Sequence, residues 1–62
     1  MDKPKVKLTG ENGNIFNLIG IATNALKKEN MNEFANEMQE RCMSSKSYFE
    51  AISIIQEYVE VI

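Results

Sequence analysis

The sequence predicts a small α+β domain in which three short helices lie between two strands, in the order β-α-α-α-β. Apolar residues alternate with polar ones near both ends of the chain, which indicates strands. In between, apolar residues recur every three to four positions, which indicates helices. With 62 residues, the chain is expected to form one domain, residues 1–62.

The first strand is expected in the segment KVKLT, residues 5–9. Val6 and Leu8 alternate with polar residues, so one face of the strand is expected to be covered. Pro4 suits the beginning of a strand because it cannot donate a ladder hydrogen bond. The segment GENG, residues 10–13, then supplies a turn.

The first helix is expected from Ile15 to Glu29. Asn14 is a suitable N-cap because its side chain can accept a hydrogen bond from an early backbone N–H. One face of this helix is apolar and consists of Ile15, Ile19, Ala22 and Leu26.

The second helix is expected to begin after Asn30, which approximates a capping box with Glu33. Its apolar face consists of Met31, Phe34, Ala35, Met38 and Cys42. The third helix is expected to begin after Ser47, with Glu50 as the reciprocal capping partner. Its buried stripe is expected to consist of Tyr48, Ala51, Ile52 and Ile55.

The closing segment YVEVI, residues 58–62, is β-branched and alternating, and it predicts the second strand. We expect the two end strands to form a small antiparallel ribbon on which the helices pack. Lys5 and Lys7 belong to one strand, whereas Glu57 and Glu60 lie on or near the other. Opposite charges on neighbouring strands contribute roughly 0.2–1 kcal/mol, which favours this pairing.

The first helix carries more apolar surface than two short helices and a ribbon easily cover, because a second apolar stripe lies beside the first. Gly20 within this helix indicates close approach of another backbone, from the same chain or from a second one. A two-stranded ribbon also leaves two unpaired edges. We therefore predict a homodimer with a four-stranded sheet, and a compact monomer is the alternative. The expected interface residues are Leu18, Gly20, Ile21, Ala25, Val59 and Val61.

Catalysis is not expected, and neither a metal site nor a cofactor is predicted. The chain has no histidine and one cysteine, so it lacks a side chain that titrates near neutral pH by default and cannot form an internal disulfide. Cys42 falls on the apolar face of the second helix, where a thiol without a neighbouring base serves packing.

The net charge of −2 argues against general nucleic-acid binding, since that affinity comes largely from neutralising phosphates. A small DNA-binding regulator stays an alternative, although the second helix lacks the basic and amide side chains that read bases. No window is long and apolar enough for a membrane span. The first residues lack the apolar stretch of a secretory signal, so a reducing cytoplasm is expected.

Two surfaces are candidates for binding. The turn before the first helix can attract an anion such as a nucleotide to the helix N-terminus, although its glycines equally suit a tight corner. The acidic face of the second helix can contact a basic, nucleic-acid-handling protein, and the alternative is a solvated face. The anion-binding candidates are Lys5, Lys7, Asn12, Gly13 and Asn14, and the candidates for partner contact are Glu33, Glu37, Glu40 and Arg41.

The segments KVKLTGENGNIFNLIGIATNALKK and YFEAISIIQEYVEV resemble a family of short, mostly uncharacterised proteins of bacteriophages and prophages. The shared pattern is a K-V-x-L-x-G-x-x-G-N-x-F-x-L-I-G opening, an aromatic-rich helix and a closing Y/W-V-E-V strand. In size and setting the chain is also similar to the Hachiman anti-defence type. The resemblance implies a non-catalytic protein of the host bacterial cytoplasm that binds and inhibits a host protein, a component of a defence system against phages. A module that binds a small anionic ligand is the alternative.

Overall fold

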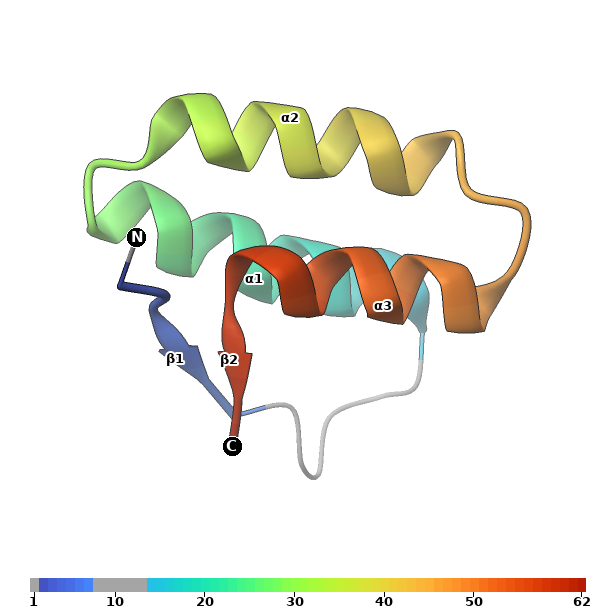
Figure 1. The fold of residues 1–62 in the computed structure, drawn as a ribbon, viewed down its shortest axis with the longest axis horizontal. Helices are drawn as coiled ribbons and strands as arrows, with labels where there is room; N and C mark the ends of the chain where they lie inside the picture. The colour runs from blue at the N-terminus through green and yellow to red at the C-terminus, as the bar shows by residue number, and fades with distance from the viewer. Residues whose placement is uncertain (1, 8–13) are drawn as a thin grey trace.

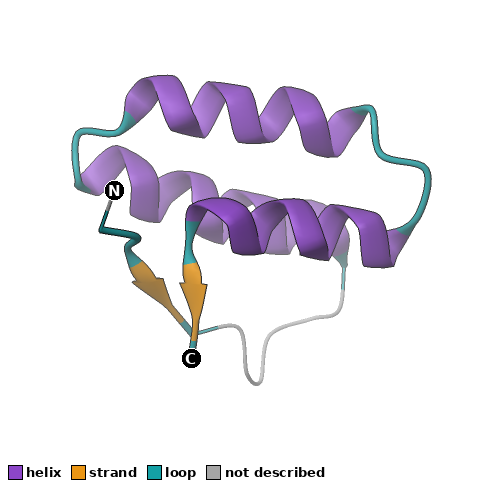
Figure 2. Cartoon of the chain, in the orientation of Figure 1, coloured by secondary structure: helices purple, strands orange, loops and turns teal. Residues whose placement is uncertain are grey.

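The computed structural model describes residues 2–7 and 14–62. Its elements are strand β1 (Lys5–Val6), helix α1 (Ile15–Lys28), helix α2 (Asn32–Met43), helix α3 (Tyr48–Tyr58) and strand β2 (Glu60–Val61). The predicted α+β class and the predicted order of elements are confirmed (Figure 1 and Figure 2). The expected end of the first strand and the turn at 10–13 lie outside the described residues.

The three helices form one bundle, and the two strands lie side by side next to it (Figure 1). Each helix runs back along the preceding one, so α1 and α3 run in the same direction. α1 packs against α2, α3 and β1, and α3 packs against α1, α2 and β2.

The core fills the space between the helices and one side of the ribbon. Ala22 of α1 and Ala35 of α2 are fully buried, and these small side chains let the helices approach closely. The predicted apolar faces of α1 and α2 are confirmed in the main, but Ile15 is half-buried and Phe34 is exposed. The largest fully buried side chains come from all three helices and from the residue before β2: Leu26, Met38, Ile55 and Val59.

The buried face of α3 differs from the prediction. Tyr48 is exposed and Ile52 is half-buried, whereas Ile54 and Tyr58 are buried instead. The run AISII is apolar on two adjacent helical faces, so its sequence does not decide which face turns inward. Because α3 extends to Tyr58, the face that also buries this large ring lies against the core.

Two of the predicted helix caps are present. The Asn14 side chain accepts a hydrogen bond of 2.8 Å from the backbone N–H of Phe16. The Ser47 hydroxyl accepts one of 3.1 Å from the backbone N–H of Glu50. The Glu50 carboxylate does not complete the expected capping box, because it accepts from the backbone N–H of Lys46 at 3.4 Å.

Asn30 ends α1 and does not cap α2, which corrects the prediction. Its φ of 61° is in the left-handed region, which asparagine tolerates better than most residues. Its N–H donates to the carbonyl of Lys27 at 3.0 Å, and the next N–H, of Met31, donates to Leu26 at 2.9 Å. This pair of bonds is a Schellman motif. The cap position of α2 is Met31, which offers no side-chain hydrogen bond.

The two terminal strands pair as predicted, but in parallel, so the expected antiparallel ribbon is wrong. Lys5 lies opposite Glu60 and Val6 lies opposite Val61. Opposite charges favour this pairing without fixing its direction. The direction follows from the odd number of helices, since α3 delivers the chain to the end of the bundle beside which β1 begins (Figure 1).

We expect Asn30→Gly to hold or raise the free energy of unfolding and Asn30→Ala to lower it by about 1 kcal/mol, because a β-carbon is strained at positive φ. Urea denaturation followed by circular dichroism measures both changes. Asn36→Ala is the matched control: Asn36 lies in the exposed middle of α2, where alanine should stabilise the helix slightly. Equal effects of alanine at positions 30 and 36 would contradict the assignment of the motif.

Candidate functional site

Four large apolar side chains are exposed at one end of the helix bundle, and we call this surface the apolar end. Its residues are Phe16, Met43, Tyr48 and Phe49, with exposed fractions of 66%, 67%, 44% and 79%. They come from the first turn of α1, the last residue of α2 and the first turn of α3. These three helix ends lie together at the right of Figure 1.

The apolar end is shaped by the turn that joins α2 to α3. The rings of Tyr48 and Phe49 meet edge to face, with centroids 5.9 Å apart. Phe16 and Met43 line two adjoining hollows with volumes of about 330 Å³ and 730 Å³. Contiguous apolar patches on small proteins commonly mark interaction sites, so this end can receive a partner's apolar side chains.

The residues predicted for a dimer interface do not form one surface. Leu18 and Val59 are buried by their own chain, which corrects their assignment to an intersubunit contact. Gly20, Ile21 and Ala25 are half-buried on α1, and Val61 is exposed on β2. Among the described residues, apart from the chain neighbours of Gly20 and the nearby backbone of its own helix, no atom lies within 4 Å of the position that a β-carbon on Gly20 would take, so close packing there does not account for this glycine.

The acidic face of α2 takes part in packing this helix on α3, through a polar network of Glu37, Arg41, Glu57 and Tyr58. Arg41 donates two hydrogen bonds to the Glu57 carboxylate, at 2.8 and 2.9 Å, and one of 3.1 Å to the Tyr58 hydroxyl. The same hydroxyl donates to the Glu37 carboxylate. Two of the predicted partner contacts, Glu37 and Arg41, thus form hydrogen bonds within the chain, although they are exposed like the other two, Glu33 and Glu40.

The network shifts the ionisation of its members. The hydrogen bonds from Arg41 lower the pKa of Glu57 below its ordinary value of 4.5. The hydrogen bond to Glu57 raises the pKa of Arg41 in turn. Burial raises the pKa of Tyr58, so its hydroxyl stays protonated and can donate to Glu37.

The candidates for anion binding are only partly brought together. Asn12 and Gly13 lie outside the described residues, and the Asn14 side chain caps α1. Lys5 and Lys7 are exposed on and just after β1 and line a groove of about 650 Å³ against α1. Lys28, from the last turn of α1, lines the same groove and was not among the predicted residues. The helical spacing from Ile21 to Lys28 is the signal that could have placed it there.

Cys42 is buried, as its place on the apolar face predicts, and burial raises the pKa of its thiol. Its sulfur lies 3.8 Å from the carbonyl oxygen of Ala51. In the described part of the chain, no group of three or more His, Cys, Asp or Glu side chains is placed to hold a metal ion. Within residues 2–7 and 14–62, no helix is both long and apolar enough to cross a membrane.

No protein-family model matches the chain, and neither a curated protein nor a solved structure matches it significantly. The candidate site is therefore argued from its own geometry. Sequence reasoning missed the apolar end because it placed Tyr48 in the buried stripe of the third helix. The position of two aromatic residues in their helices could have indicated this surface. Phe16 and Phe49 each follow the first residue of a helix, where few neighbouring turns exist to cover a large ring.

We expect the stabilising effect of Glu57 to depend on pH. Because its folded-state pKa is lowered, its contribution is fully present above the ordinary value of 4.5 and is lost as the pH falls through the folded-state pKa. Glu57→Gln should therefore lower the free energy of unfolding most near neutral pH and least in acid. Urea denaturation between about pH 7 and pH 3 measures the difference.

Glu40→Gln is the control for this titration, because it removes an exposed carboxylate of the same charge outside the network. A difference between wild type and Glu57→Gln that stays constant across the pH range would contradict the role of the ion pair.

Proposed function

We propose that this chain is a small non-catalytic phage protein that acts in the host bacterial cytoplasm by binding and inhibiting a host protein, a component of an anti-phage defence system. The observation that supports binding is the apolar end, where four large side chains stand in solvent. The resemblance of the opening and closing segments to phage and prophage proteins is what supports a phage origin and a bacterial host.

The chemistry around the apolar end favours a particular kind of partner. Aromatic anchors contribute most to binding when they enter an apolar pocket that excludes water. Glu40 lines one of the hollows, and Glu50 follows Phe49 directly, whereas Lys46 supplies one positive charge there. The favoured partner is therefore an apolar pocket with basic side chains at its rim, as a nucleic-acid-handling defence protein can offer.

We expect Phe49→Ser to abolish inhibition while the free energy of unfolding stays within about 0.5 kcal/mol of wild type, since Phe49 is mostly exposed. The measurement is the plating efficiency of a phage on bacteria that carry a Hachiman defence system and express either protein. Wild type should restore plating, and Phe49→Ser should not.

Phe49→Leu is the matched control because it keeps an apolar side chain at the same position, and it should retain most of the inhibition. Met43→Ser, which alters the same surface from α2, should reproduce the loss. Equal plating with wild type and Phe49→Ser would remove the apolar end from the proposal. Failure of wild type to restore plating would reject this defence system as the target.

We also propose a homodimer, formed through the outer edge of β2. In the parallel ladder, Glu60 and Ile62 donate to the carbonyls of Pro4 and Val6 at 2.8 and 2.9 Å, so the backbone groups of Val61 face away from β1. Pairing two such edges about a two-fold axis would give the four-stranded sheet. Pairing two β1 edges instead would bring like-charged lysines together, which is unfavourable.

We expect sedimentation of wild type to report a species of twice the 7.1 kDa chain mass, and Val61→Lys to shift it to a single chain. Val61 is exposed, so the substitution should leave the helical circular dichroism unchanged. Lys5→Val, on the neighbouring strand, is the comparison variant and should not dissociate the dimer. A single-chain species for wild type at micromolar concentration would reject this proposal.

A further inference from the structure

The groove between β1 and α1 combines a strand edge with a helical face. Its strand side is the continuous segment of residues 3–7, and its helix side is formed by Ile21, Asn24, Ala25 and Lys28. The helix residues recur at i, i+3, i+4 and i+7, so they form one stripe along the groove. A groove of this build fits a chain in extended conformation, as in peptide recognition by strand addition.

The edge of β1 that lines this groove has backbone N–H and C=O groups that can form hydrogen bonds with an added strand. Pro4 and Val6 direct their carbonyls to β2, where they accept from Glu60 and Ile62. Alternate residues of a strand direct their backbone groups to opposite edges, so the N–H and C=O of Lys5 face the other way. No backbone hydrogen bond of Lys5 is found among the described residues.

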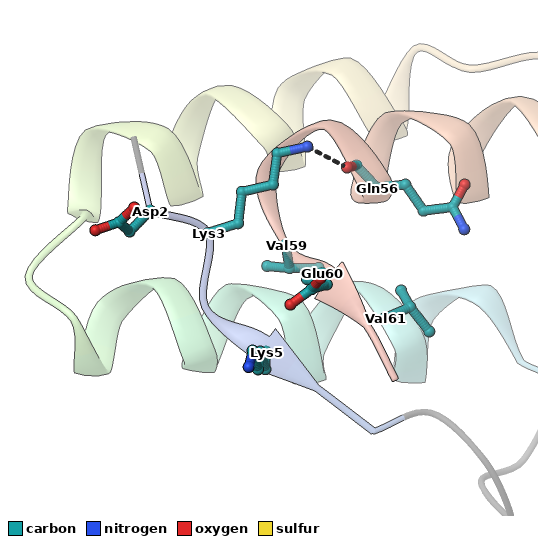
Figure 3. Close-up of a pocket in the computed structure, with 7 residues that line it drawn as sticks. All are labelled: Asp2, Lys3, Lys5, Gln56, Val59, Glu60 and Val61. Carbon is teal, nitrogen blue, oxygen red and sulfur yellow. Dashed lines mark hydrogen bonds between the residues drawn. The ribbon is translucent and has the colours of Figure 1, made fainter.

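The charges along the groove are mostly positive. Lys5, Lys7 and Lys28 line it, and Glu29 is the one carboxylate among the lining residues that the structure describes. Lys3 is directed to the other side, where its ammonium donates to the carbonyl oxygen of Gln56 at 3.1 Å (Figure 3). The hollow on that side mixes Asp2 and Glu60 with lysines, so it lacks a comparable excess of positive charge.

The chain's own strand β2 indicates which sequence suits β1. Its Glu60 lies opposite Lys5, and its Val61 lies opposite Val6. A strand added on the other edge of β1 would meet the same two faces, with lysines on the outer face and Ile21 and Ala25 of α1 beside the inner one. A strand in which acidic and apolar residues alternate suits both faces, because its acidic side chains lie beside the lysines and its apolar side chains lie beside α1.

We propose that the groove between β1 and α1 binds an extended segment of a partner protein in which acidic and apolar residues alternate, and that this segment adds a third strand to the ribbon at Lys5. This interaction goes beyond the proposed function, because it uses a surface separate from the apolar end and does not depend on the identity of the defence protein.

The test uses a fluorescein-labelled octapeptide of alternating glutamate and valine, with fluorescence anisotropy as the readout of binding to the whole chain. We expect saturable binding that weakens about tenfold in the double variant Lys7→Glu, Lys28→Glu, which leaves the Lys5–Glu60 pair intact. Lys46→Glu, which changes an exposed lysine at the apolar end, should bind as wild type does. Circular dichroism confirms that each variant is folded.

A second peptide tests strand addition without altering the protein. Methylation of alternate backbone nitrogens preserves every charge but removes the hydrogen bonds to the strand edge, and it should abolish binding. In hydrogen exchange, the amide of Lys5 should become protected only with the unmethylated peptide. Equal binding of both peptides, or no binding to wild type, would overturn the proposal.

A single-stranded oligonucleotide or a free nucleotide that binds as tightly as the peptide would also overturn it, since the lysines would then attract anions in general. The proposal for the groove and the proposal of inhibition through the apolar end fail separately. Phe49→Ser should keep peptide binding while it loses inhibition, so loss of inhibition alone concerns the apolar end and loss of peptide binding alone concerns the groove.

Discussion

The structure depends on the burial of α1 from several sides at once. Ala22 and Leu26 are completely buried, because α2 and α3 both pack on this helix and Val6 of β1 belongs to the same core. In so small a chain one core is shared by all the elements, so a change that exposes α1 would weaken the packing of the other elements as well. The Schellman motif at Asn30 also contributes to the burial of α1, since it lets α2 fold back directly onto this helix.

Much of this arrangement could be predicted because it follows from local patterns. A few neighbouring residues determine each of the features that were predicted. These features are the caps at Asn14 and Ser47, the extent of α1, and the charges of the lysine and glutamate that face each other in the two end strands. The direction of the ribbon was not predictable from such patterns, because it depends on how three helices return the chain. The face of α3 was ambiguous for a related reason: only the assembled core decides between Ile52 and Ile54.

The candidate site was harder to predict than the fold. An exposed aromatic side chain and a buried one look alike in a sequence, and Tyr48 illustrates this, since its spacing suits either place. Arg41 presents the converse case: a charged residue on a polar helix face was taken for a partner contact, yet it binds Glu57 and lies 5.7 Å from the centre of the Tyr58 ring. Whether such a side chain packs within the chain or faces a partner depends on which helices pair with each other. The sequence of a single helix does not determine that pairing.

The hydrogen bond from Lys3 to Gln56 joins residues 53 positions apart, and it supplies a cation to the end of a helix that has no basic residue in its own last turn. Closing so long a loop costs conformational entropy before any contact is gained, whereas the helix pairs need only short turns. The ribbon is therefore expected to form last during folding and to open first during native-state fluctuations. Whatever binds its edges would slow that opening, and so would lengthen the lifetime of the folded chain against proteolysis.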